Sequence, residues 1–413
     1  MRVYVPVEIV IEGDVTVKSI DRAVRRAWQE FPSLAWQRAV SAVEATAVRQ
    51  DNGTLRVKGY EKRTLWTSAG FAEFRRRRFF YADGREEGSF HVFDMRVGLE
   101  KYERFTPAAG ETCAKLASIS PSYRKASEIT ELLLGDAPSD WSIWTRTQDE
   151  GRRLRGEDSK ERRRVFQEGE LPGSDVPAKR FVAVEADSTK IHAWKENGVN
   201  HEMYLGIAYD GKEHVGRKRW RVTNKVAACG VYGSKTFGED LFVAAQKNHN
   251  VVDAETALFL SDGDPALEEI RRNHFPQAHH QIDQRHVVEK VRQAYGWDSI
   301  EGAKKVMKHI FSGERESYEE QSIFDRLRFG ERRSKIDEAR EYVEKHWEEL
   351  FTYRELKRRH PELPPHMNGT GAMERNIGTV VGHRMKHRGM GWTRKGAANI
   401  MRVRLEMVAP RTS

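Results

Sequence analysis

The sequence is poor in cysteine and contains no long apolar run. Cys113 and Cys229 are its two cysteines in 413 residues. Two cysteines cannot cross-link a chain of this size and cannot alone form a cysteine zinc site, which excludes a disulfide-rich secreted protein and a zinc-finger protein. No stretch approaches the roughly 18–20 apolar residues that a membrane-spanning helix needs, and the N-terminus lacks the residue order of a secretory signal. These absences predict a soluble, cytoplasmic protein without a membrane partner.

Basic residues outnumber acidic ones. The chain has 71 Lys and Arg against 62 Asp and Glu, a net charge of +9 at pH 7. Charged residues make up 32% of the sequence, above the average of about 25%. Basic clusters occur at residues 75–78, 152–164, 217–221 and 384–388. The excess indicates a polyanionic partner, although a basic surface also favours solubility.

The first hundred residues change from helical to strand-like patterns. Alternating apolar residues from 3 to 11 predict a strand, and residues 17–48 predict a helix that breaks near Pro32. Short β-rich runs with turn signals then predict a small antiparallel meander. We therefore assign residues 1–59 to an N-terminal strand and helix region of unknown role, and residues 60–105 to the meander.

Residues 106–168 predict two helices separated by a compact turn. Ser120 is a candidate N-cap and Gly135 a candidate C-terminal stop for the first helix, and Ser139 or Asp140 suits the N-cap of the second. Such a pair is compatible with a helix-turn-helix, whose second helix reads DNA. An ordinary helical hairpin fits the pattern equally well.

A Gly- and Pro-rich stretch at residues 169–177 predicts a linker to a second domain. Strands are then predicted at residues 181–187, 204–209, 225–232, 256–260 and 278–282. Helices between the later strands indicate a mixed α/β sheet. We predict one α/β domain from residues 178–286 and 366–413, interrupted by an all-helical insertion at residues 287–365.

Two acidic residues follow apolar strands of the predicted sheet. Asp187 ends the first strand and shares a face with Glu185, because side chains alternate along a strand. Asp262 follows a later strand, whereas Asp264 precedes Pro265 and suits the N-cap of a helix. Open sheets bind ligands at the C-terminal ends of their strands, which favours Asp262 for chemistry. A strand-end acid that bonds a neighbouring turn is the simpler explanation for Asp187.

Glu374 is the third candidate acid and lies in an early turn of a predicted helix. The helix dipole alone favours an acid there, by roughly 0.3–1 kcal/mol. Carboxylates from three separated positions can hold two Mg²⁺ or Mn²⁺ ions, and such a pair promotes in-line phosphoryl transfer. Asp187, Asp262 and Glu374 are the three candidate positions for such a site.

Residues 181–187, 261–263 and 369–374 together resemble the DDE transposases of insertion sequences, most of all the Mutator-like group. The resemblance implies a ribonuclease-H-like catalytic domain that uses two metal ions for DNA cleavage and strand transfer, with Asp187, Asp262 and Glu374 as its metal ligands and catalytic residues. It also implies a helical insertion before the catalytic glutamate, where residues 287–365 lie.

Two further segments resemble the same family. Asp283 and His286 fit its motif of Cys or Asp, two residues and His, which assigns them to accessory positions in the site. Residues 384–392 resemble the basic, tryptophan-ended segment that follows the catalytic glutamate. The resemblance implies DNA contacts at seven positions, in the basic segment and in the helix-turn-helix: Arg384, Lys386, Arg388, Trp392, Arg124, Lys125 and Arg146.

The resemblance implies a transposase that binds terminal inverted repeats, cleaves them and transfers the 3′-hydroxyl ends to target DNA. Pairing two DNA ends implies a dimer or larger assembly, nucleoid-associated when bound to DNA. Two alternatives stay open: a ribonuclease-H-like nuclease that cuts without joining, and a non-catalytic DNA-binding regulator descended from a transposase.

Overall fold

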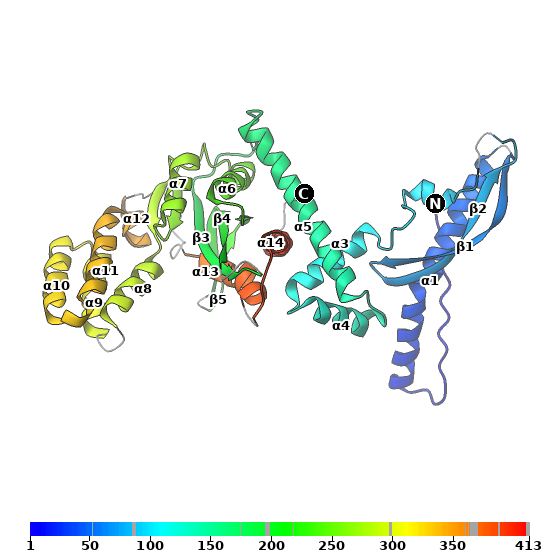
Figure 1. The fold of residues 1–413 in the computed structure, drawn as a ribbon, viewed down its shortest axis with the longest axis horizontal. Coiled ribbons are helices and arrows are strands. Elements are labelled where there is room, and N and C mark those ends of the chain that lie inside the picture. The colour runs from blue at the N-terminus through cyan, green and yellow to red at the C-terminus, as the bar shows by residue number, and fades with distance from the viewer. Residues whose placement is uncertain are drawn as a thin grey trace. The chain divides into compact units, whose positions relative to one another are not determined.

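The chain divides into two compact units, Met1–Glu150 and Gly151–Ser413. The computed structural model describes residues 1–51, 53–84, 88–173, 175–194, 199–217, 219–296, 300–359, 361, 363, 371–386 and 389–409. Figure 1 labels the helices and strands. The division falls inside helix α5 (Asp140–Phe166), before the stretch at residues 169–177 that the sequence suggests as a linker.

The first unit begins with a long helix on a β-hairpin. Helix α1 (Val17–Gln50) starts at Thr16, whose hydroxyl accepts a hydrogen bond from the backbone N–H of Ser19. Strands β1 (Leu55–Thr67) and β2 (Gly70–Tyr81) pair antiparallel. The helix and hairpin share a core that contains Val40, Leu65, Ala72, Phe74 and Phe93.

Three predictions for this region differ from the structure. Residues 3–11, all described, form no strand, because the alternating run has no partner strand to bond. Helix α1 continues through Pro32, and the proline ring is buried near the hairpin turn. A side-chain Cβ added at Gly70 in this turn would lie 3.5 Å from Cγ of Pro32. The predicted meander is a single hairpin followed by the short helix α2 (Val92–Val97).

Three helices complete the first unit. They are α3 (Pro107–Ile119), α4 (Tyr123–Leu134) and the first part of α5. They pack around a small core that contains Phe105, Ala109, Cys113, Ala117, Ala126 and Ile143. The alanines and the cysteine of this core are small, so the helices approach closely and form a compact cluster.

The helix ends in this cluster largely follow the sequence signals. Gly135 ends α4 in the left-handed conformation with a φ of +83°, as predicted. Ser139 lies before α5, and its hydroxyl accepts a hydrogen bond from the N–H of Ser142 at 3.2 Å, also as predicted. The N-cap of α4 is Ser122, however, and Ser120 instead ends α3.

A mixed five-stranded sheet forms the centre of the second unit, which confirms the predicted α/β class. Its strands are β3 (Val182–His192), β4 (Asn200–Tyr209), β7 (Val226–Gly230), β8 (Ala257–Ser261) and β9 (His279–Ile282). The spatial order is β7-β4-β3-β8-β9. β3, β4 and β7 pair antiparallel, whereas β3, β8 and β9 run parallel.

Helices α6 (Ser234–His249) and α7 (Pro265–His274) pack on this sheet. Their shared core contains Val184, Ala208, Phe237, Leu241, Phe259 and Ile270. A second hairpin, of β5 (Gly211–Gly216) and β6 (Arg219–Thr223), extends beyond β4 and was not predicted.

The predicted insertion is helical in the structure. It contains α8 (Gln284–Tyr295), α9 (Ile300–Ser312), α10 (Arg315–Arg328), η2 (Gly330–Arg332), α11 (Arg333–Lys345), η3 (Trp347–Glu349) and α12 (Tyr353–Arg359). These helices have their own core, with Val287, Val291, Ile310, Tyr318, Ile336 and Val343. Ile282 of β9 belongs to the same core, which joins the helices to the sheet.

The C-terminal part returns to the sheet. Helix α13 (Met373–Ile377) contacts β3, and a π-helix, η4 (Gly378–Lys386), follows directly. Helix α14 (Arg394–Val408) packs against β7. The guanidinium of Arg404 donates to the carbonyl oxygen of Val380 at 2.6 Å, so α14 satisfies a backbone group of the π-helix. Among the described residues, no helix is both long and apolar enough to cross a membrane.

Candidate functional site

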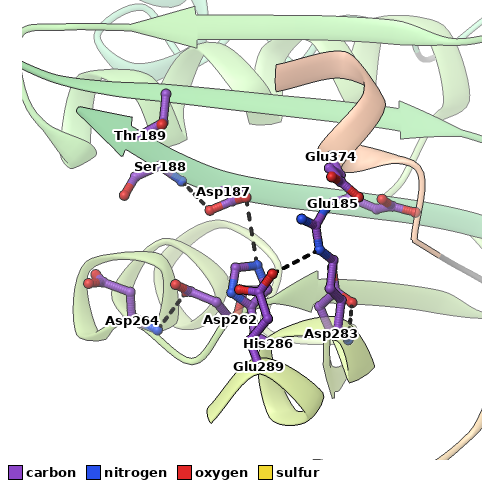
Figure 2. A network of polar contacts seen from close by, with 12 residues as sticks. Glu185, Asp187, Ser188, Thr189, Asp262, Asp264, Asp283, His286, Glu289 and Glu374 are labelled. Carbon is purple, nitrogen blue, oxygen red and sulfur yellow. Dashed lines mark hydrogen bonds and ion pairs between the residues drawn. The ribbon is translucent and has the colours of Figure 1, made fainter. Parts of the chain in front are cut away.

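Asp187 and Asp262 lie at the same edge of the central sheet. Asp187 is on β3, and Asp262 follows the last residue of the neighbouring parallel strand β8. The prediction that Asp187 ends its strand is wrong, because pairing with β4 continues β3 to His192. Asp187 still lies level with Asp262, because Glu185 pairs with Leu260 two residues earlier on each strand. Figure 2 shows the Asp187 carboxylate pointing toward His286 on the first turn of α8, and Asp262 beside His286 with its carboxylate directed to the backbone of Asp264.

The environment of Asp187 is rich in negative charge. Its side chain is 17% exposed, and this burial raises its pKa to about 6. His286 opposes the shift, with Nε2 at 3.8 Å from Oδ2 of Asp187, while the carboxylates of Asp262 and Asp283 raise the pKa further. The N–H of Ser188 donates to Oδ1 at 2.7 Å. A bound cation would relieve this accumulation of charge.

The two neighbouring acids after β8 have different partners. The carboxylate of Asp264 caps α7 by accepting a hydrogen bond from the N–H of Ala266 at 2.8 Å, which confirms the predicted N-cap. Asp262 accepts from the N–H of Asp264 through Oδ1 at 2.9 Å. The Tyr342 hydroxyl donates to the backbone carbonyl oxygen of Asp262 at 2.7 Å, so α11 holds this loop from the other side.

The accessory residues lie at the start of α8. Asp283 caps this helix, and its carboxylate accepts from the N–H of Arg285 at 2.9 Å. The N–H of Asp283 donates to the carbonyl oxygen of Ser261 at 2.8 Å, next to Asp262. This connection places Arg285 and His286 in the first turn of α8, at the sheet edge that carries the acids.

Glu374 is near the other acids but has another partner. Its side chain is 67% exposed and forms an ion pair with Arg285. Arg285 also contacts Glu289, with Nε 3.2 Å from Oε1. Within the part of the chain that the structure describes, no three His, Cys, Asp or Glu side chains form a group that could hold a metal ion. Asp187 and Asp262 therefore meet as predicted, whereas Glu374 does not complete a ligand set in this conformation.

Glu185 is a buried residue of the site that the sequence argument did not assign a role. Its side chain is fully buried, which raises its pKa. Oε1 accepts hydrogen bonds from the Tyr209 hydroxyl at 2.5 Å and the N–H of Gly371 at 3.0 Å. Oε2 accepts from the N–H of Ala372 at 2.6 Å. The strand that carries Asp187 thus fixes the backbone just before Glu374. The sequence signal that could have identified Glu185 is the presence of an acid within an apolar strand.

The donor atoms at the sheet edge suit a hard divalent cation. Asp187 and Asp262 supply carboxylate oxygens, the ligand type that Mg²⁺ and Mn²⁺ prefer. The raised pKa of Asp187 reflects burial and neighbouring carboxylates that the one nearby imidazole does not neutralise. The pair therefore fits as part of a cation site, whereas Glu374, the third predicted ligand, is paired with Arg285.

A family model covers nearly the whole chain. The match spans residues 14–409. The chain belongs to the uncharacterised protein family UPF0236. No curated protein matches it. The matched region therefore includes most of both units and all residues of the acidic site.

The basic C-terminal segment of this UPF0236 chain is divided between buried and exposed residues. Arg384 is 3% exposed, and its guanidinium lies 5.2 Å from the ring centroid of Trp392, itself 8% exposed. The N–H of Trp392 donates to the carbonyl oxygen of His192 at 3.0 Å, at the end of β3. Burial favours structural roles for Arg384 and Trp392 over the expected DNA contacts. Lys386 is exposed and donates to the Thr189 hydroxyl, and Arg388 lies outside the described residues.

The three basic residues expected to contact DNA in the helical cluster are accessible. Arg124 is 78% exposed and Lys125 is 52% exposed, and both pair with Glu128 on α4. Arg146 on α5 is 36% exposed and lies 3.1 Å from Asp149. Surface pairs of this kind are weak, typically about 0–1 kcal/mol, so DNA phosphates could displace the carboxylates.

Proposed function

We propose that this protein is the transposase of an insertion sequence. It binds terminal inverted repeats, cleaves DNA and transfers the 3′-hydroxyl ends to target DNA by metal-dependent phosphoryl transfer. The observation that supports this most is the convergence of Asp187, within β3, and Asp262, directly after β8, with α13 and Glu374 tied to β3 through Glu185.

The sheet supports a ribonuclease-H-like catalytic domain. An antiparallel group, β7, β4 and β3, is extended by two parallel strands, β8 and β9. The helical block from α8 to α12 lies between β9 and the helix with the third acid, where the resemblance implies an insertion. Asp187, Asp262 and Glu374 thus come from three different elements of one domain.

The acidic residues suit two-metal chemistry. A bound pair of Mg²⁺ or Mn²⁺ ions would activate the attacking hydroxyl and stabilise the leaving 3′-oxygen. Asp187 and Asp262 would hold the ions, with Glu374 as the third ligand. His286 would remain beside Asp187, where an imidazole steadies the carboxylate, and Asp283 would fix the start of α8.

DNA binding would also release Glu374. In the structure the Glu374 carboxylate is paired with Arg285. A guanidinium binds phosphate oxygens with two parallel hydrogen bonds, so a DNA phosphate competes well for Arg285. We infer that Arg285 moves to the DNA backbone, which frees Glu374 to join Asp187 and Asp262.

Helices α4 and α5 would recognise the terminal repeats as a helix-turn-helix. Their exposed residues Arg124, Lys125 and Arg146 supply contacts to phosphates or base edges. Lys386 would contact the backbone near the catalytic site. Cleavage at two ends requires two sites, so the working form would be a dimer or larger assembly.

The proposal is tested with the full-length chain, a DNA end that carries the element's terminal inverted repeat, and a target plasmid. We expect Mg²⁺-dependent nicking that leaves a 3′-hydroxyl, followed by joining of that end to the plasmid, and loss of both with EDTA. Nicking without joined products would instead support the nuclease. Binding without any nicking in Mg²⁺ or Mn²⁺ would support the regulator.

A further inference from the structure

A basic groove lies between α8 and α11 in the helical insertion. Its volume is about 700 Å³. The described residues that line it include four cations, Lys290 and Arg292 on α8 and Arg332 and Lys335 beside or on α11, and one acid, Glu338. Four cations around one carboxylate give this groove a strong positive potential.

The cations of the groove outnumber the acids that line it among the described residues. Within the described residues, none of these four side chains forms an ion pair with a carboxylate, and Glu338 instead accepts a hydrogen bond from Ser334 at 3.3 Å. Several other arginines of the insertion pair with acids: Arg285 with Glu289, Arg326 with Asp337, and Arg340 with Glu344. The groove therefore differs from its surroundings in unbalanced charge.

The groove begins next to the candidate catalytic site. The Lys290 ammonium lies 4.5 Å from the ring centroid of Tyr342, and the hydroxyl of Tyr342 bonds the backbone of Asp262. Lys290 follows His286 by one helical turn on α8, a rise of roughly 6 Å. Arg292 lies two residues beyond Lys290 on the same helix and also lines the groove. A polymer in the groove would therefore extend directly from the acidic site.

We propose that this groove binds the phosphodiester backbone of DNA that flanks the scissile phosphate. The proposal rests on the proposed function for the chemistry at Asp187 and Asp262. The lining supports a polyphosphate over a protein partner, because its apolar side chains are two alanines, Ala294 and Ala339. Protein interfaces centre on large aromatic or aliphatic residues, which this groove lacks among its described lining residues.

The test compares two triple variants of the full-length protein with equal charge change. The groove variant is Arg292→Gln, Arg332→Gln and Lys335→Gln. The control is Lys304→Gln, Lys305→Gln and Lys308→Gln, which removes three exposed cations of α9 outside the groove. Binding to a labelled random-sequence DNA duplex is measured across a range of NaCl concentrations, and thermal unfolding shows whether each variant folds.

We expect the groove variant to bind DNA at least about 10-fold more weakly at moderate salt. The slope of log K against log salt concentration should also become less steep by about 2–3, because fewer counterions are released on binding. The control should stay close to wild type. Equal binding by the groove variant and wild type would overturn the proposal, as would equal losses in both variants. Because this readout needs no cleavage, absence of nicking by the wild type would contradict the proposed function while leaving the groove tested.

Discussion

At the scale of single residues, two acids of one strand have different roles because their neighbours differ. Glu185 and Asp187 share a face of β3, as the alternation of the sequence predicts. Glu185 is fully buried and receives three hydrogen bonds, so its carboxylate is satisfied by the protein. Asp187 has carboxylates and one imidazole nearby. The first acid therefore positions the backbone, and the second is suited to bind a cation.

The raised pKa of Asp187 predicts a pH-dependent stability difference. The pKa is about 6 in the folded protein, against an ordinary value of 3.8. The unfolded chain therefore ionises first, and wild-type stability falls as pH rises from about 4 to 6, by up to ~3 kcal/mol before solvent screening. In EDTA, Asp187→Asn should be more stable than wild type at pH 8, with the gap shrinking toward pH 4.

Urea unfolding across this pH range measures the effect. Asp264→Asn is the control, because asparagine also caps a helix well and should keep the wild-type pH dependence. A gap between Asp187→Asn and wild type that is the same at pH 4 and pH 8 would contradict the assigned environment.

Some residue roles could not be predicted from local sequence. Arg384 and Lys386 look equally exposed in a basic run, yet Arg384 is buried against Trp392, which is itself held by a hydrogen bond to His192 at the distant end of β3. The pairing of Glu374 with Arg285 also depends on residues far apart in the chain. In contrast, Asp264 could be predicted as an N-cap, because proline at the next position is a local signal.

At the scale of elements, the link from β3 to α13 determines the third acid's position. Glu185 bonds the N–H groups of Gly371 and Ala372, which immediately precede α13. Gly371 has a φ of +90°, a conformation that glycine adopts without strain. The segment before Glu374 is therefore held by specific bonds to the strand that carries Asp187.

Glu185→Gln tests this link. The amide keeps one acceptor oxygen but places an NH₂ group against an N–H or hydroxyl donor, so we expect cleavage to fall about 10- to 100-fold, with more Mg²⁺ needed for half-maximal rate. Tyr209→Phe is the matched control, because it removes one donor to Glu185 and leaves the two backbone bonds. Equal Mg²⁺ dependence in both variants would mean that Glu185 is only a buried structural group.

The elements that the sequence predicted best are those with complete local signals. The five strands of the central sheet were all predicted, because short apolar runs bounded by turns leave few alternatives. The run at residues 3–11 shows the limit, because alternation cannot show whether a partner strand exists. Pro32 shows another limit of local sequence patterns. Proline would break a helix locally, but packing against the hairpin stabilises this one. The β5–β6 hairpin is mostly polar, so it lacks the apolar runs from which strands were predicted.

At the scale of the whole molecule, the net charge of +9 lies almost wholly in the second unit, which has 48 Lys and Arg against 40 Asp and Glu, whereas the first unit has 23 against 22. Accessible basic residues of α4 and α5 lie in the first unit and at the start of the second, whereas the acids and the basic groove lie in the second. This separation suits a protein that recognises one DNA segment and acts on another. The mixed α/β class was predictable from the order of patterns, while the unit boundary inside α5 was not, because one continuous helix runs through it and the turn residues of a linker follow only at residues 169–177.

The most direct test of the central claim compares Asp262→Asn with Asp264→Asn in Mg²⁺-dependent nicking of the terminal-repeat DNA. Both changes remove one charge from the same loop, but Asp264 is occupied as the cap of α7. We expect Asp262→Asn to lose activity by about 10²–10³-fold or more, since a lost metal ligand costs several kcal/mol of transition-state stabilisation. Asp264→Asn should remain near wild type. Full activity of Asp262→Asn would contradict the assignment of the catalytic site.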